Sequence, residues 1–225
     1  MQHQKMQSKH YELPSPRLTR GEYWLMEIMA EHMIPAGFLG RDDLVMVLNK
    51  PLPGLSQDEL LATILELSRQ GLVSYTTRHD ETERQFSSTD QIRDAVSEES
   101  RRGRGKTILC LTTAGARVWE AFAAPRWDEY IADSYGFDES LCQDVTELIC
   151  TNRRLLERYL KSAHPSLSQI DPSQVWWDIL EPWEVTYWKI LPKAHRVRFV
   201  DPDDGMEESP PPSPYILPPR WHRWD

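Results

Sequence analysis

The chain has 225 residues, of which 40% are apolar, and a formal net charge of −9 at pH 7. This length and composition allow a packed core in one large or two small domains. No apolar run approaches the roughly 20 residues of a membrane-spanning helix. The polar N-terminus lacks the apolar core of a secretory signal, so we expect a cytoplasmic protein without membrane contact.

The charges argue against a general nucleic-acid-binding surface. Residues 1–125 contain 15 basic and 17 acidic residues, and residues 126–225 contain 11 basic and 18 acidic residues. Because phosphate neutralisation supplies most nucleic-acid affinity, any basic patch must be local. Cys110, Cys142 and Cys150 lack CxxC spacing and are interpreted as core residues, although Cys142 and Cys150 can share one helix face. No metal site is predicted.

Two helices are predicted near the start of the chain. Residues 1–17 are polar and interrupted by prolines, which is typical of a flexible lead-in. Thr19 and Glu22 have the capping-box spacing of a helix that ends before Pro35. Residues 40–49 predict a second, shorter helix with an apolar face of leucine and valine.

The segment from residue 56 to residue 75 is the centre of the predicted fold. Ser56 and Glu59 form a second capping box, and leucine and isoleucine residues follow at helical spacing. Gly71 supplies the left-handed residue that ends such a helix, and β-branched and aromatic residues begin a strand directly after it. The sequence therefore predicts a third helix, a glycine stop and a strand in succession.

A long insertion, residues 79–105, separates this strand from a second strand predicted at 107–111, with which the first should pair. Within the insertion, residues 87–96 predict a short capped helix. The basic run at residues 101–106 combines four charges with two glycines, so it is expected to form a flexible tip between the two strands.

The second strand leads into Leu-Thr-Thr-Ala-Gly at residues 111–115, where Thr112 or Thr113 caps a helix that ends at Pro125. This order of helices, strands and turn resembles the winged-helix (winged helix-turn-helix) regulators over about residues 18–124. The resemblance implies a winged-helix-like domain whose third helix enters the major groove of DNA and whose wing contacts the backbone.

The C-terminal region, residues 125–200, is expected to be a helical and tryptophan-rich extension without a recognised family. Its predicted elements are a long helix at 138–164, a short helix at 171–180, and a hairpin of strands at 182–190 and 195–200. The acidic and proline-rich tail, residues 201–225, is typical of a disordered segment. The predicted fold class is thus mainly α with a small β wing.

The outward positions of the predicted third helix carry three acidic residues and one basic residue. Acidic side chains repel phosphate, so this helix is a weak candidate for reading DNA. Its outward residues are instead candidate contacts to a protein partner, namely Gln57, Asp58, Thr63 and Glu66. The tryptophans Trp177, Trp183 and Trp188 are either the core of the C-terminal region or further partner contacts.

The first hypothesis is a non-enzymatic regulatory or adaptor protein without a cofactor or small-molecule ligand, because the sequence contains no nucleophile elbow, phosphate loop or dinucleotide fingerprint. Its partner is a protein or a second copy of the chain, paired through the helix at 138–161. The alternative is a DNA-binding transcription regulator. The residues that would contact nucleic acid are Arg69, Arg101, Arg102, Arg104 and Lys106.

Overall fold

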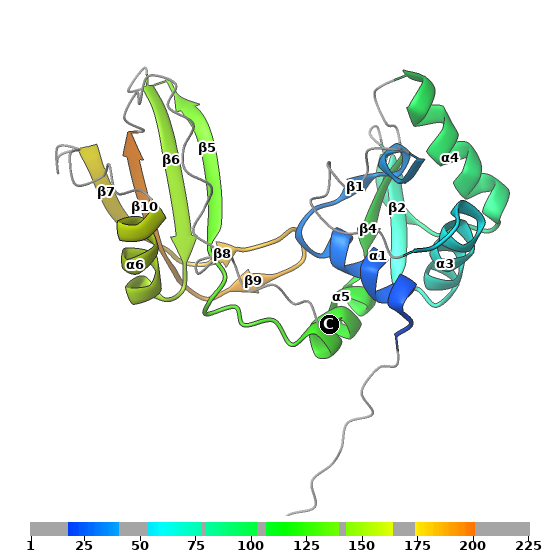
Figure 1. The fold of residues 1–225 in the computed structure, drawn as a ribbon, viewed down its shortest axis with the longest axis horizontal. Helices are drawn as coiled ribbons and strands as arrows, with labels where there is room; N and C mark the ends of the chain where they lie inside the picture. Colours follow the sequence, from blue (N-terminus) through cyan, green and yellow to red (C-terminus); the bar gives the residue numbers. More distant parts are fainter. Residues whose placement is uncertain are drawn as a thin grey trace, which may run out of the picture. The chain divides into compact units, whose positions relative to one another are not determined.

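The computed structural model describes residues 18–40, 54–77, 80–102, 107–139, 143–163 and 174–200. The chain divides into two compact units between residues 122 and 123, and each is described by itself. The described residues form five α-helices and ten strands in three antiparallel sheets (Figure 1). The protein is therefore mixed α/β, and the prediction of a mainly α protein is wrong.

The first unit combines helices with a four-stranded sheet of order β1-β4-β2-β3. Its helical elements are α1 (Arg20–Glu31), the 3-10 helix η1 (Ala36–Gly40), α3 (Gln57–Arg69), α4 (Thr89–Arg102) and α5 (Thr113–Ala123). Its strands are β1 (Ile34–Pro35), β2 (Val73–Thr77), β3 (Asp80–Arg84) and β4 (Thr107–Leu111). The second helix predicted at residues 40–49 falls almost wholly on residues 41–50, outside the described part.

Both predicted capping boxes are confirmed. Thr19 Oγ1 accepts a hydrogen bond from the Glu22 N–H at 3.3 Å, and the Glu22 carboxylate accepts one from the Thr19 N–H at 2.7 Å. Ser56 and Glu59 repeat this exchange at 3.3 and 2.8 Å. Each box satisfies donors that the first turn of a helix cannot satisfy internally.

The predicted glycine stop after α3 is also confirmed. Gly71 has φ +70°, and the N–H of Leu72 donates to the carbonyl of Leu67 at 2.9 Å, as in a Schellman motif. Thr112 Oγ1 donates to the Gly71 carbonyl at 2.6 Å and binds the start of α5 to this turn. A Cβ on Gly115 would lie 1.9 Å from the Leu72 carbonyl oxygen, so only glycine fits there.

The insertion is part of the core of the first unit. Strands β2 and β4 pair as predicted, from Val73 opposite Leu111 onwards. The chain between them forms β3 and then α4, which is longer than the helix predicted at 87–96. Ile92 and Phe86 are buried, and the Phe86 ring stacks on Tyr75 with centroids 4.3 Å apart.

The second unit contains a four-stranded sheet of order β5-β6-β10-β7, one helix and a two-stranded pair. The sheet is formed by β5 (Ala132–Asp138), β6 (Gln143–Cys150), β7 (Val175–Leu180) and β10 (Ala194–Val200). The helix is α6 (Arg153–Ala163), and the pair is β8 (Trp183–Glu184) with β9 (Ile190–Leu191). Leu156 and Leu160 of α6 pack with Leu148, Val197 and Phe199 of the sheet.

Three predictions for this region are wrong. Residues 132–138 and 143–150 are paired strands, so within the described residues the helix predicted at 138–164 is formed only over 153–163. The single helix of the dimer hypothesis is therefore not formed, and Cys150 ends a strand instead of sharing a helix face with Cys142, which lies outside the described residues.

The other two errors concern β7 and β10. The short helix predicted at 171–180 is replaced, over its described part, by β7, and β10 pairs with β6 and β7 instead of with 182–190. Valine, isoleucine and tryptophan in these segments suit a half-buried strand. The residues of β7 are compatible with both helical and strand periodicity, and pairing with β10 selects the strand. The lead-in at 1–17 and the tail at 201–225 lie outside the described residues.

Candidate functional site

Helix α3 buries one face and leaves a polar stripe on the other. Leu60, Ile64 and Leu67 point into the core. The four outward residues predicted as partner contacts keep their polar groups at the surface: Gln57, Asp58 and Glu66 are exposed, and Thr63 is half-buried. Thr63 Oγ1 donates to the Glu59 carbonyl at 2.7 Å, so its hydroxyl is engaged within the helix.

Helix α4 lies beside α3 and covers one flank of it (Figure 1). The N–H of Phe86, which precedes α4, donates to Ser68 Oγ at 2.9 Å. At the other end of the contact, the Arg93 guanidinium lies 3.4 Å from the Asp58 carboxylate. Because α4 occupies this flank, a double helix approaching α3 would meet α4 as well.

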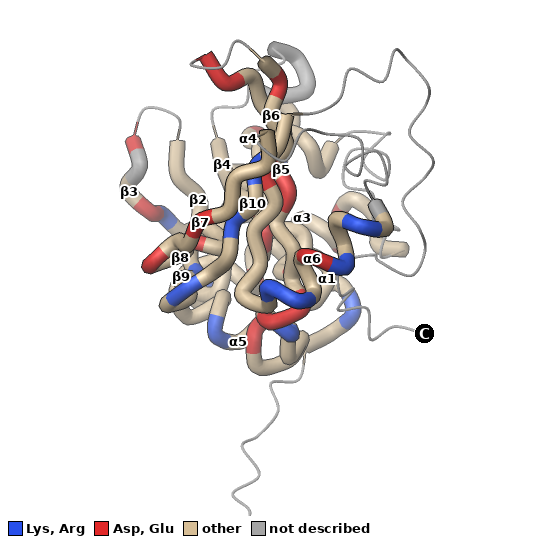
Figure 2. The backbone as a smooth tube through the Cα atoms, turned by 90° about the vertical axis from the view of Figure 1, so that its left-hand side faces the viewer, with Lys and Arg blue, Asp and Glu red and all other residues tan. Residues whose placement is uncertain are grey.

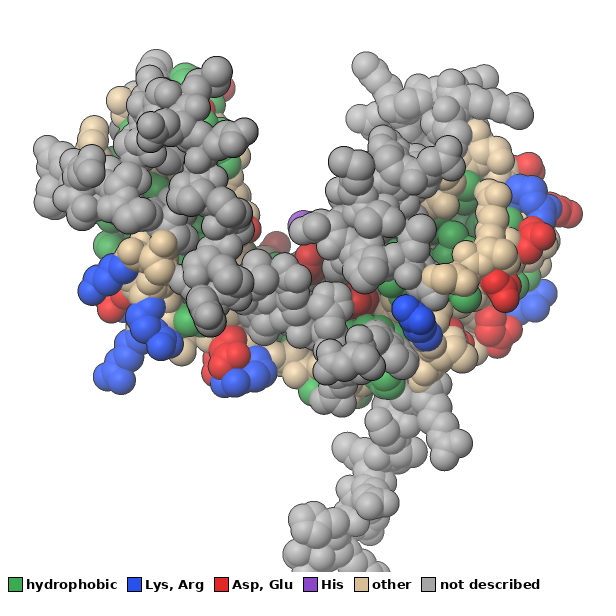
Figure 3. Space-filling model, viewed as in Figure 1, with side chains coloured by type: hydrophobic (Ala, Val, Ile, Leu, Met, Phe, Trp, Pro, Cys, Tyr) green, Lys and Arg blue, Asp and Glu red, His purple; other side chains and the backbone are tan. Residues whose placement is uncertain are grey.

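The exposed charges of these two helices define the α3–α4 surface, whose described members are Asp58, Glu59, Glu66, Arg69, Asp90, Arg93 and Asp94. Five carboxylates and two guanidinium groups give these described members a net charge of −3. Red and blue side chains both show over α3 and α4 in Figure 3, with red the more frequent. Sequence reasoning omitted Asp90 and Asp94, although the inward positions of Ile92 and Val96 would have placed them outward.

Hydrogen bonding keeps one of these carboxylates charged. Hydrogen bonds from the Ser56 N–H and then from its hydroxyl lower the pKa of Glu59. The Glu66 carboxylate accepts a hydrogen bond from Gln70 Nε2 at 2.9 Å. On the outer strand β3, hydrogen bonds from the Thr82 hydroxyl and N–H lower the pKa of Asp80, which also forms an ion pair with Arg84. Ser74 Oγ donates to Glu83 at 3.2 Å.

Of the residues predicted to contact DNA, the structure describes the side chain of Arg69 and the backbone of Arg101 and Arg102. Arg69 lies in the last turn of α3 and is exposed. Arg101 and Arg102 are the last two residues of α4, so the run begins in a helix and not in a flexible tip. The last turn of α4 points away from the turn between α3 and β2 (Figure 1). The side chains of Arg101 and Arg102, together with Arg104 and Lys106, lie outside the described residues.

The three predicted tryptophans have different environments in the second unit. Trp183 is 4% exposed and packs with Val185 and Ala194, so it is a core residue. Trp177 is half-buried and lies under the Arg153 guanidinium, whose carbon is 4.9 Å from the ring centroid. Trp188 is also half-buried and meets Trp127 edge to face at 6.0 Å.

The sheet of the second unit has a cluster of charged side chains that form hydrogen bonds and ion pairs with one another. Arg196 of β10 donates to Asp178 of β7 at 2.8 Å and to Glu147 of β6 at 3.2 Å. The hydrogen bond from Arg196 is also the main reason that the pKa of Asp178 is lowered. These cross-strand pairs hold three neighbouring strands in register, which is a structural role. Within the described ranges, no three acidic, cysteine or histidine side chains are placed to hold a metal ion.

The comparisons with known proteins leave the fold resemblance as a prediction. No family model, no curated protein and no solved structure matches the chain. Among the described helices, none is both long enough and apolar enough to cross a bilayer. The candidate functional site is therefore defined by geometry and charge alone, and it is the α3–α4 surface.

Proposed function

We propose that the first unit is a winged-helix-like module that binds a protein, and not DNA, through the α3–α4 surface. The whole chain is then a non-enzymatic regulatory or adaptor protein that acts in the cytoplasm. The partner presents basic side chains toward Asp58, Glu66 and Asp94. In this proposal the scaffold is inferred from the winged-helix resemblance, and the basic partner is inferred from the negative charge of the α3–α4 surface.

The position of α4 carries the proposal. A helix that reads DNA needs a free face of about one groove width and a positive potential toward phosphate. Here α4 covers one flank of α3 and adds Asp90 and Asp94 to it. Carboxylates that face phosphate lose affinity, whereas the same carboxylates favour arginine and lysine on a protein and exclude acidic competitors.

The experiment places a photo-crosslinking residue at Ala62, which is exposed in the middle of α3. Irradiation of the full chain in its native cells should give one discrete adduct that contains protein. The yield of the adduct should fall at least tenfold when Asp58→Asn and Glu66→Gln remove two charges from the α3–α4 surface.

The matched control is Asp133→Asn with Asp144→Asn, which removes two charges from the second unit. This variant should leave the Ala62 adduct unchanged. An adduct that contains nucleic acid, or a protein adduct that persists after the charges on α3 are removed, contradicts the proposal.

A further inference from the structure

Helix α6 is amphipathic, and its outward face is basic. Leu156 and Leu160 pack into the core of the second unit. Residues at i, i+4 and i+7 lie on one face of a helix, and on α6 the outward positions of that spacing are Arg154, Arg158 and Lys161. All three side chains are exposed, and together they form what we call the basic stripe. Blue positions recur along α6 in Figure 2, and blue side chains project from the surface over α6 in Figure 3.

The basic stripe has no partner among the described residues. The nearest acidic residue on the helix, Glu157, accepts a hydrogen bond from Arg153 Nε at 2.9 Å. Arg153 also covers the Trp177 ring, so it is held in place by the fold. The side chains of Arg154, Arg158 and Lys161 make no ion pair or hydrogen bond within the part of the chain that the structure describes.

Local helix stability does not explain the positive charge at the start of the basic stripe. Positive charge is unfavourable in the first turn of a helix, where the macrodipole is positive, and Arg153 and Arg154 occupy the first two positions of α6. α3 has the favourable arrangement, with Asp58 and Glu59 in its first turn. Lys161 lies in the last turn, where positive charge is favourable. Among the three stripe residues, it is therefore Arg154 whose charge is better explained by an external anion than by the helix itself.

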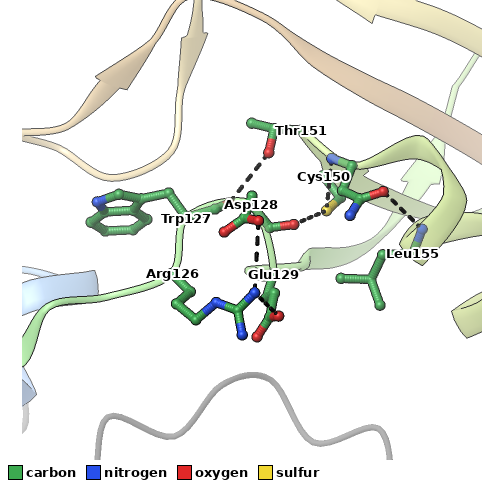
Figure 4. A network of polar contacts seen from close by, with 8 residues as sticks. Arg126, Trp127, Asp128, Glu129, Cys150, Thr151 and Leu155 are labelled. Carbon is green, nitrogen blue, oxygen red and sulfur yellow. Dashed lines mark hydrogen bonds and ion pairs between the residues drawn. The ribbon is translucent and has the colours of Figure 1, made fainter.

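The turn before α6 is joined to the segment that precedes β5, so the basic stripe keeps its orientation. Asn152 Oδ1 accepts a hydrogen bond from the Leu155 N–H at 3.2 Å and caps the helix. Thr151 Oγ1 donates to the Trp127 carbonyl at 3.4 Å, and the Cys150 thiol lies 3.8 Å from the Asp128 carbonyl oxygen (Figure 4). These contacts join the turn before α6 to the segment that precedes β5.

We propose that the basic stripe binds the phosphate backbone of a nucleic acid. The stripe spans seven residue steps, or about 10 Å at the α-helical rise, and a nucleic-acid backbone presents regularly spaced charges over such a length. An acidic protein would have to present three carboxylates in one line to match it. Two of the three residues are arginines, which bind phosphate bidentately. Because the proposed contact is to phosphate, it is independent of the base sequence.

Fluorescence anisotropy of the full chain with a labelled duplex of about 20 base pairs, at salt concentrations from about 25 to 200 mM, tests the proposal. The variant Arg154→Ala, Arg158→Ala, Lys161→Ala should bind at least tenfold more weakly at the lowest salt. It should also flatten the slope of log affinity against log salt by about 2 to 3, because each lost phosphate contact contributes about 0.9. Alanine favours helix, so circular dichroism should show a folded variant.

The matched control removes the same charge from exposed positions of the first unit outside the α3–α4 surface, as Arg20→Ala, Arg84→Ala, Arg117→Ala, and should leave the affinity and slope unchanged. The charge-preserving variant Arg154→Lys, Arg158→Lys, Lys161→Arg should keep the salt slope. No binding at the lowest salt overturns the proposal, and so does a loss confined to the first-unit variant. Displacement of the duplex by polyglutamate at equal charge concentration would identify an acidic protein as the ligand and also overturn it.

Discussion

Helices α3 and α6 have the same amphipathic design but differ in the charges of their exposed faces. Each is a capped, amphipathic helix that buries a leucine face against its own unit and leaves a charged stripe outside. On α3 the first-turn charges agree with the helix dipole. The carboxylates of Glu59 and Glu66 accept hydrogen bonds from the Ser56 N–H and from Gln70 Nε2. On α6 the first-turn charges oppose the dipole, and the basic stripe has no partner among the described residues. The two surfaces therefore differ in the sign of their exposed charges and in whether those charges have hydrogen-bond partners, and not in the fold that carries them.

Substitution of Gly115 should destabilise the first unit around α3 and leave α6 of the second unit intact. A new Cβ would lie 1.9 Å from the Leu72 carbonyl oxygen, which is backbone and cannot move freely. We expect Gly115→Ala to destabilise the first unit by about 3 kcal/mol or more. Hydrogen-exchange mass spectrometry should show faster exchange in α3, β2 and α5, while α6 keeps its protection.

The control for this substitution is Gly136→Ala in β5, where no atom lies within 4 Å of the new Cβ. It should change stability by less than about 0.5 kcal/mol. Equal effects of the two substitutions would mean that the close approach at Gly115 does not stabilise the turn after α3.

The two helix caps should differ in their response to acid. Ser56→Ala and Asn152→Ala each remove a cap and should each cost about 1 kcal/mol at pH 7. Folding lowers the pKa of Glu59, so the stabilisation by its carboxylate is complete above the unfolded pKa and is lost as the pH falls through the folded one. The cost of Ser56→Ala should therefore decrease in acid, whereas the Asn152 amide does not titrate.

Denaturant unfolding of both variants and the unchanged chain at pH 7 and about pH 3 measures the two costs. The two variants control for each other, since general acid effects act on both. A cost of Asn152→Ala that falls in parallel with that of Ser56→Ala would remove the difference between the two caps.

The smallest effect is expected at the ion pair between α4 and α3. Arg93 lies 3.4 Å from Asp58 and 2.6 Å from Asp90, and its side chain is 49% exposed. Solvent screens such pairs, so Arg93→Ala should cost less than about 0.5 kcal/mol. Ile92→Val, one residue away and fully buried, should cost about 1 kcal/mol by thermal unfolding. A larger loss at Arg93 would mean that charge, and not packing, holds α4 beside α3.

Local interactions made much of the first unit predictable from sequence. The boxes at Thr19 and Ser56 join residues three apart, and Gly71 ends α3 through its own backbone conformation. The outward position of Asp58 and Glu66 follows from the period of the buried leucines in the same way. The flank covered by α4 was not predictable, because it depends on contacts between segments more than twenty residues apart.

The second unit was mispredicted for the same physical reason. Val145 to Cys150 is compatible with both helical and strand periodicity, and pairing with Ala194 to Val200, far along the chain, selects the strand. The spacing of Arg154, Arg158 and Lys161 was visible within the predicted long helix. Their isolation from carboxylates became evident only when α6 proved to start at Arg153 and Glu157 proved to bond Arg153.

Each unit contains a buried cysteine whose reaction rate can report how often that unit opens. Cys110 lies in β4 of the first unit and Cys150 at the end of β6 of the second, and burial raises the pKa of both thiols. Thiolate, the form that reacts with alkylating reagents, is scarce at both sites until the surrounding strands separate. In a chain with Cys142 changed to serine, the labelling rates of the two thiols would therefore record how often each unit opens, in one sample and without a spectroscopic probe.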